Sequence, residues 1–324
     1  MTSGPATGDS PPLIVIAGAT ATGKTGLSIG LAHALGAEGV AAEIISADSR
    51  QVFRGVDIGT AKVPAADRAR IPHHGLDLVD PDEPFSIAAF VTHTRAALVG
   101  IAARGAVAML VGGTGLYLRA ITRGLDTDAL PSDPVVRAAV EALLASEGLP
   151  AAVERLQAIA PNAAARIDLR NPRRVARALE VAEIAGDVPL PAPRGYLAPI
   201  LWLGLSLAPA VHLEWIRARA TAQFAAGLVD EARALRERWE PALPCFSAIG
   251  YREAWAVLDD VLDVPAAIEL DVARNVAFAR RQRTWFRREP GIEWLDPAVV
   301  DPLPRALDRA DALLANRAPR AAER

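Results

Sequence analysis

Residues 13–25 read LIVIAGATATGKT, and this stretch decides the fold. Leu13 to Ala17 is a short apolar run of the kind found in buried parallel strands. The residues from Gly18 to Thr25 have two glycines separated by four residues and followed by lysine and threonine, which is the pattern of a phosphate-binding loop. Helical spacing then continues to Leu35. A strand, a glycine-rich loop and a helix in this order predict an α/β domain built around a phosphate site.

The chemistry of this loop follows from its residue types. Glycines let the backbone turn so that several N–H groups point at one anion, and the N-terminus of the next helix adds partial positive charge. Lys24 supplies a compact positive charge, and Thr25 offers its hydroxyl to Mg²⁺, the cofactor that we expect. An ordinary strand–turn–helix connection is the alternative, but the motif and its context both favour phosphate. The motif alone does not distinguish a nucleotide from another diphosphate.

The rest of the chain extends this pattern and then interrupts it. Short apolar runs at 42–47, 107–111 and 200–207 predict further strands, and 85–103 predicts a helix. We therefore expect a parallel sheet with helices on both faces. Residues 133–186 have an entirely helical pattern, and a proline-rich linker follows at 188–199. Long helices are expected at 210–239, 248–258 and 265–288.

These elements predict a P-loop α/β core at 13–125 and 200–297, which includes C-terminal helices. An all-helical insertion domain at 126–199 interrupts this core. The ends, 1–12 and 316–324, are expected to be disordered.

Composition limits the possible partners and locations. The net charge is −3, so any binding to nucleic acid must come from local basic patches. A single cysteine, Cys245, excludes an intramolecular disulfide. No signal peptide and no membrane span is evident, and we expect a monomer in the cytoplasm. Of 35 basic residues only Lys24 and Lys62 are lysines, so lysine chemistry is a candidate role for each, with chance as the alternative for Lys62.

Two polar residues follow predicted strands at the same edge of the sheet. Asp48 comes directly after the strand at 42–47, where a carboxylate can bind Mg²⁺ through water or accept a proton. Capping of the next helix is the alternative role for this aspartate. Thr114 lies within Gly112–Gly115, where it can hydrogen-bond a substrate or simply form a turn. Because the strand at 107–111 ends in glycines rather than aspartate, ordinary nucleotide hydrolysis is weakly disfavoured.

Several motifs together resemble the bacterial tRNA dimethylallyltransferases, and the resemblance runs from Leu13 to about Trp294. These enzymes prenylate the adenosine 3′ of the anticodon. The matching segments are GATATGKT, ISADSRQVFRGVDIGTAKV, PHHGLDLVDPDEPFS, LVGGTGLYLRA, NPRRVARALE, AIGYREA and RRQRTWFRR. The second segment is by far the most specific, because phosphate-binding loops occur in many families.

The resemblance implies substrates and site residues. It implies that Gly18, Ala19, Thr20, Ala21, Thr22, Gly23, Lys24 and Thr25 bind the diphosphate of dimethylallyl diphosphate. It implies catalytic roles for Asp48, Thr114 and Arg219, of which Arg219 would lie near the leaving diphosphate. The implied partner is the anticodon stem-loop of tRNA. The implied tRNA contacts are Asp48, Ser49, Arg50, Gln51, Thr114, Arg137, Arg173, Arg174, Arg177, Ser247, Gly250, Tyr251, Arg252, Arg280, Arg281, Gln282, Trp285 and Arg287.

The chain departs from the family pattern at a few positions. Phe53 stands where tyrosine is common, Ser247 where glutamine is common, and Trp215 where arginine is frequent. The stretch 275–278 lacks its usual polar character. These departures concern fine tRNA contacts and the rate, and they leave the phosphate loop and Asp48 intact.

Two other functions remain open from the sequence. A P-loop kinase of a small metabolite or nucleotide would consume a nucleotide and need no tRNA. A nucleotide-switched RNA-binding protein would make no bond, and its function would survive the substitution Asp48→Asn.

Overall fold

The computed structural model describes residues 10–124, 130–189 and 195–315. It divides into two compact units, Met1–Arg123 with Gly195–Arg324, and Gly124–Arg194. The ends 1–12 and 316–324 were expected to be disordered. Of these, residues 1–9 and 316–324 lie outside the described residues. Pro11 and Pro12 differ from that expectation, because both are buried. The hydroxyl of Tyr196 also donates to the carbonyl of Pro11 at 2.7 Å, so ordered chain begins before the first strand.

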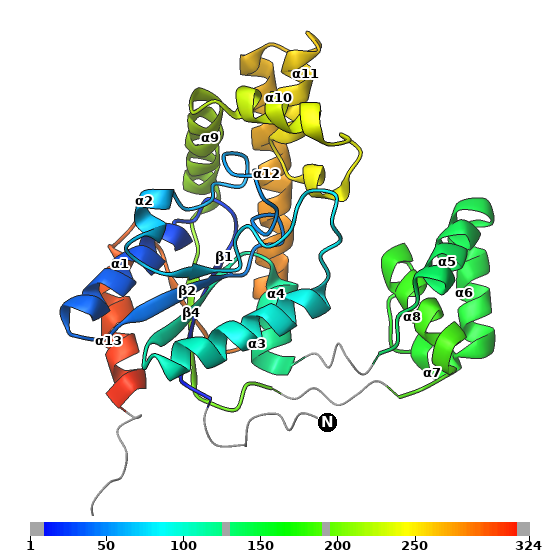
Figure 1. Ribbon diagram of the computed structural model, residues 1–324, viewed down its shortest axis with the longest axis horizontal. Coiled ribbons are helices and arrows are strands. Elements are labelled where there is room, and N and C mark those ends of the chain that lie inside the picture. The colour runs from blue at the N-terminus through cyan, green and yellow to red at the C-terminus, as the bar shows by residue number, and fades with distance from the viewer. Residues whose placement is uncertain (1–9, 125–129, 190–194, 316–324) are drawn as a thin grey trace, which may run out of the picture. The chain divides into compact units, whose positions relative to one another are not determined.

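The first unit is built on a six-stranded sheet with the order β3-β2-β4-β1-β5-β6. All neighbouring strands pair in parallel, which confirms the predicted fold class (Figure 1). The strands are β1 (Leu13–Gly18), β2 (Ala42–Ser46), β3 (His73–His74), β4 (Val107–Gly112), β5 (Ile200–Leu205) and β6 (Ile292–Leu295). The two edge strands, β3 and β6, were not predicted.

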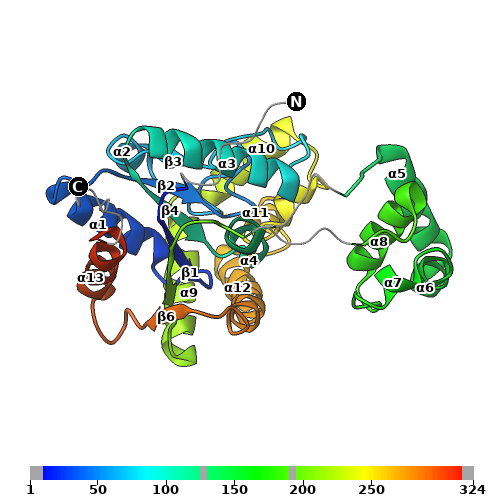
Figure 2. The same ribbon diagram turned by 90° about the horizontal axis from the view of Figure 1, so that it is seen from below.

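Helices cover both faces of this sheet (Figure 2). On one face α1 (Lys24–Ala37) and α13 (Pro302–Ala315) pack on apolar strand residues such as Ile14, Ile16 and Met109. On the other face lie α3 (Ile87–Ala103) and α4 (Gly115–Arg119), with α2 (Ala65–Arg68) in the connection before α3. A π-helical turn, Ala120–Gly124, follows α4. The hydroxyl of Ser86 caps α3 by accepting from the amide of Ala89 at 3.1 Å, which fixes the expected start.

A second apolar core joins the C-terminal helices to the loop after β2. These helices are α9 (Pro209–Ala225), α10 (Leu228–Arg238), α11 (Tyr251–Leu258) and α12 (Val264–Phe286), with a 3₁₀ turn at Pro244–Ser247. The expected single helix at 210–239 is in fact two. Gly227 has a φ of 99°, a left-handed conformation that glycine adopts freely, and the chain turns there between α9 and α10. Tyr251 and Phe246 are fully buried at the centre of this core.

The unit Gly124–Arg194 is helical within its described residues. It contains α5 (Pro134–Ser146), α6 (Gly148–Ile159), α7 (Pro161–Ala164) and α8 (Pro172–Ala185). The side chains of Asp133 and Asn171 accept from the first free amides of α5 and α8, so both helices begin at good N-caps. Leu156, Val175 and Leu179 are fully buried in a separate small core.

Lys62 has a structural role in the first unit. Its ammonium donates to the carboxylates of Asp57 and Asp77, each at 2.6 Å, and to the carbonyl of Phe53. The side chain is 2% exposed. An ammonium has three donors and no acceptor, so three oxygens satisfy it completely. This lysine therefore holds the loop after β2 together.

Candidate functional site

The phosphate-binding loop folds tightly between β1 and α1. Gly18 and Gly23 have φ values of 155° and 89°, and Ala21 has 57°. A side chain at Gly18 would lie 2.7 Å from the carbonyl oxygen of Leu205. The buried hydroxyl of Thr22 donates to the carbonyl of Ala19 at 2.9 Å and closes the turn. The loop thus delivers Lys24 and Thr25 to the first turn of α1, where backbone N–H groups have no partner within the helix.

Two cations converge beside this loop. The ammonium of Lys24 donates to the carbonyl of Ala19 at 2.6 Å, and Arg219 on α9 donates to the hydroxyl of Thr20 at 2.9 Å. Burial, and then repulsion from Arg219, lower the pKa of Lys24 to about 8, although Asp48 opposes this. Burial also lowers the pKa of Arg219, and its Nε is buried with no hydrogen-bond partner among the described residues. Buried cations that repel each other and include an orphaned donor are suited to an anion.

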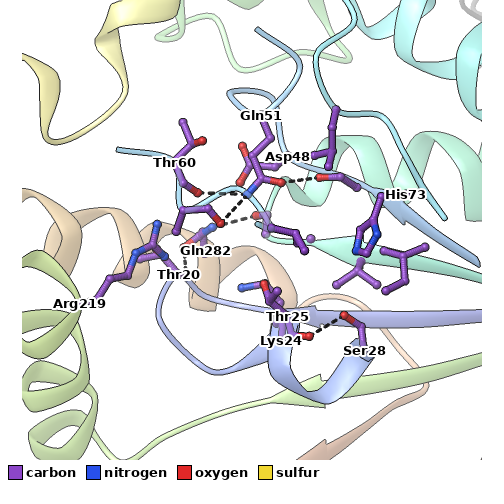
Figure 3. A pocket seen from close by; sticks show the side chains of 18 of the residues that line it. Thr20, Lys24, Thr25, Ser28, Asp48, Gln51, Thr60, His73, Arg219 and Gln282 are labelled. Carbon is purple, nitrogen blue, oxygen red and sulfur yellow. Dashed lines mark hydrogen bonds between the residues drawn. The ribbon is translucent and has the colours of Figure 1, made fainter. Parts of the chain in front are cut away.

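Asp48 and Thr114 meet across the ends of β2 and β4. Asp48 lines the same cavity as Lys24, Thr25 and Arg219 (Figure 3). Its Oδ1 accepts from the amide of Arg50 at 2.8 Å and closes a turn, and no helix of the described residues begins between β2 and α2, so the helix-capping alternative is wrong. The hydroxyl of Thr114 accepts from the amide of Ser49 at 3.2 Å. The structure therefore brings Asp48 into one cavity with two cations, and it places Thr114 in the adjoining loop, in contact with the residue after Asp48.

The cavity also suits a phosphate-borne Mg²⁺. Thr25 is exposed on the first turn of α1, and Asp48 lies in the same cavity. Among the described residues, no group of three or more His, Cys, Asp or Glu side chains could hold a metal ion. Mg²⁺ usually takes one or two protein ligands together with substrate phosphates and water, so the hydroxyl of Thr25 fits such an ion.

Tyr117 and the internal hydrogen bonds of Gln51 were not predicted from the sequence. Tyr117 stacks on Phe90 with ring centroids 4.0 Å apart. Burial, and then the charge of Asp48, raise the pKa of Tyr117 to about 12, so the ring stays neutral beside the carboxylate. The amide of Gln51 accepts from the hydroxyl of Ser46 and donates to the carbonyl of Thr60. Tyr117 could have been found from its position three residues after Thr114, because residues about one helical turn apart lie on the same face of a helix.

Some predicted tRNA-contacting side chains are used inside the protein. Tyr251 is fully buried and its hydroxyl donates to Glu231 at 2.6 Å, while Gly250 is the N-cap of α11. Gln282 is also buried, at 7% exposure. In the helical unit, Arg137 and Arg177 surround the buried carboxylate of Glu180.

Other predicted tRNA contacts are on the surface. The exposed residues are Arg173, Arg174, Arg252, Arg280, Arg281 and Arg287. Trp285 is half-buried, and the guanidinium of Arg119 lies over its ring at 4.6 Å. Nearby on α12, Phe286 faces the core.

The departures from the family pattern have local explanations. Ser247 accepts from the guanidinium of Arg50 at 2.7 Å, and thereby joins the loop after Asp48 to the turn before α11. Phe53 is buried in the second core, where a hydroxyl would need a partner. Trp215 packs on Gly23 of the phosphate loop, 3.6 Å from where a Cβ would lie. Phe278 lines the cavity itself.

Comparisons with known proteins show the family. The family model described as IPP transferase matches residues 51–289. A tRNA dimethylallyltransferase of Anaeromyxobacter sp. (strain K) is 45% identical, over 91% of this chain and 99% of the relative. Another, from Thiobacillus denitrificans (strain ATCC 25259 / T1), is 42% identical, over 94% of this chain and 96% of the relative.

Two solved structures share the fold. The full-length tRNA isopentenylpyrophosphate transferase of Bacillus halodurans has a TM-score of 0.67 and 35% identity, with 94% of this chain and 96% of that chain covered. A eukaryotic dimethylallyltransferase acting on tRNA has a TM-score of 0.76 and 26% identity, with 97% and 82% covered. With a family match over most of its length and relatives above 40% identity, the chain belongs to the IPP transferase family.

Proposed function

We propose that the chain transfers the dimethylallyl group of dimethylallyl diphosphate to the exocyclic amine of the adenosine 3′ of the anticodon in tRNA. Diphosphate is released. The observation that carries this proposal is the cavity in which Lys24 and Arg219 oppose Asp48. The names of the relatives, tRNA dimethylallyltransferases, support the same reaction.

The cationic side of the cavity fits the leaving group. The electron pair of the breaking C–O bond departs with the diphosphate, whose negative charge grows as the bond lengthens. Lys24, Arg219 and the amides of the phosphate loop would stabilise that charge. Mg²⁺, when bound, neutralises further charge on the diphosphate. The phosphate loop would thus serve a leaving group, and no phosphoryl group is transferred.

The carboxylate side fits the nucleophile. The exocyclic amine of adenine is a weak nucleophile because its lone pair is delocalised into the ring. It must be oriented, and it must lose a proton as the new C–N bond forms. Asp48 would accept that proton, and Thr114, held by the amide of Ser49, would orient the amine.

The adenosine must leave the stack of the anticodon loop to reach this cavity, which costs a few kcal/mol. In the first unit, the exposed arginines Arg280 and Arg281 of α12 and Arg287 at its C-cap would contact the phosphate backbone of tRNA. In the helical unit, the exposed Arg173 and Arg174 of α8 offer the same kind of contact. No helix among the described residues is long and apolar enough to cross a membrane. We propose that the chain acts on a soluble RNA substrate, as a monomer in the cytoplasm.

Product analysis tests the function directly. The protein is incubated with dimethylallyl diphosphate, Mg²⁺ and unmodified tRNA, and the nucleosides are then analysed by mass spectrometry. We expect a prenylated adenosine, and no product from a matched tRNA that carries guanosine 3′ of the anticodon. Absence of the product, together with ATP-dependent phosphorylation of a small molecule, would instead establish the kinase.

The affinity for dimethylallyl diphosphate without RNA is expected to fall as the pH rises through about 8. The pKa of Lys24 in the free protein is about 8, so its ammonium is lost above that pH, and anion binding favours the protonated form. The substrate does not titrate in this range, because its last ionisation lies near ~6. Calorimetry from pH 7 to 9.5, in buffers of different ionisation enthalpy, should show proton uptake on binding. A pH-independent affinity would remove Lys24 from the binding site.

A further inference from the structure

Gln282 of α12 lies between the two glycine-rich loops of the site. Its Oε1 accepts from the amide of Thr20 at 2.8 Å, and its Nε2 donates to the carbonyl of Gly113 at 3.0 Å. The first bond reaches the phosphate-binding loop and the second reaches the loop after β4 (Figure 3). The side chain is 7% exposed. One buried amide therefore connects the loop that surrounds the leaving group with the loop that carries Thr114.

The glycines beside Thr114 make room for this contact. A Cβ at Gly113 would lie 2.4 Å from the Nε2 of Gln282, and a Cβ at Gly115 would lie 2.2 Å from the ring of Trp285. Neither glycine has a positive φ, so any residue type could adopt these backbone conformations. Space is what requires glycine here, because α12 packs against the loop on both sides of Thr114.

The amide, the hydroxyl and the carbonyl of Thr20 each have a hydrogen-bond partner. Its amide donates to Gln282, its hydroxyl accepts from Arg219 at 2.9 Å, and its carbonyl lies 2.8 Å from the ring Nε2 of His212. On the opposite side, the hydroxyl of Thr114 accepts from the amide of Ser49, next to Asp48. A series of contacts therefore runs from Arg219 through Thr20 and Gln282 to the loop that carries Thr114. Thr114 in turn contacts Ser49, the residue after Asp48.

We propose that Gln282 is a positioning residue that fixes the separation of the two halves of the site. This inference rests on the proposed function, in which an amine held by Asp48 and Thr114 attacks a carbon whose leaving group is held by Lys24 and Arg219. Attack opposite a leaving group requires a close and aligned approach, and a displacement of about 1 Å can cost about 10²-fold in rate. In this role Gln282 acts through its bonds to Thr20 and Gly113.

Gln282→Met tests the proposal, because methionine has a similar length but cannot make either hydrogen bond. We expect kcat per folded site to fall ~30- to 100-fold. The dissociation constants for dimethylallyl diphosphate and for tRNA, measured separately, are expected to stay within about 3-fold. The matched control is Gln157→Met, at an exposed glutamine on α6, with unchanged kinetics expected. The amide of Thr20, followed by NMR hydrogen exchange, should exchange faster in Gln282→Met than in the control.

A double-mutant cycle tests the contact itself. Gly113→Ala should displace the Gln282 side chain and lower kcat by a similar factor. Gln282→Ala is measured alone and together with Gly113→Ala. The double variant should lower kcat little more than the larger of these two single changes, because both remove the same contact. Fully additive losses would contradict the proposal.

Three outcomes would contradict the positioning role of Gln282. A weakened tRNA affinity with unchanged kcat would make Gln282 an RNA contact and overturn the proposal. A lower folded fraction with unchanged kcat per folded site would reduce it to a packing residue. If the native protein itself forms no prenylated adenosine, the proposed function fails and the positioning role fails with it, even where the Thr20 exchange changes.

Discussion

Replacing Asp48 with asparagine is expected to slow prenyl transfer by about 10²- to 10⁴-fold at saturating substrates. The amide oxygen of asparagine can still accept from the backbone amide of Arg50, which lies 2.8 Å from Oδ1 of Asp48. The turn after β2 is therefore retained, but the side chain can no longer take the proton that the amine must lose. Single-turnover kinetics with unmodified tRNA measure the effect.

The affinity for the diphosphate separates this effect from general damage. Asp48 is a negative charge close to Lys24, so its removal should leave the affinity for dimethylallyl diphosphate unchanged or increase it. Asp311→Asn, at an exposed aspartate on α13, is the matched control. If Asp48→Asn instead kept both RNA binding and biological function, the chain would be an RNA-binding protein that makes no bond.

The central strands were predictable because their signal is local. Leu13 to Ala17 and Val107 to Val111 are continuous apolar runs, and the structure buries all of them. The edge strands gave no such signal. β3 is only the pair His73–His74, and β6 has four residues, none of which is fully buried. The helix α13 was also missed, although its buried residues Ala306 and Ala310 complete the core beneath α1.

The phosphate loop and Asp48 were predictable for a different reason. Gly18, Gly23 and Lys24 form a motif in which the chemistry of the site dictates residue type at short spacing. The role of Gln282 had no such signature, because its partner Thr20 is 262 residues away in sequence. Arg219 was found only through a family resemblance, and its contact with Thr20 depends on how α9 packs. Contacts that depend on tertiary packing leave little trace in a single sequence.

Replacing Lys24 with methionine is expected to weaken dimethylallyl diphosphate binding and to lower kcat by ~10²- to 10³-fold. The ammonium is the compact charge beside the leaving group, and methionine fills similar space without it. Lys24→Arg should recover little, because a larger planar guanidinium cannot place the same compact charge where Nζ lies, 2.6 Å from the carbonyl of Ala19. Equilibrium binding and single-turnover rates measure both effects.

In Lys24→Met the free energy of unfolding should rise while substrate binding and kcat fall. Because burial lowers the pKa of Lys24 from 10.5 to about 8, the folded protein disfavours the charged ammonium that the unfolded chain carries freely. That penalty is fully present below pH 8 and is lost as the pH rises towards 10.5. Lys24→Met removes it, so at pH 7 the Tm should rise by ~2–4 °C while binding and turnover fall. The exposed Arg95 of α3 offers the control Arg95→Met, for which neither change is expected. A Tm that falls together with activity would mean that Lys24 supports the fold, and the assignment of its charge to the leaving group would have to be abandoned.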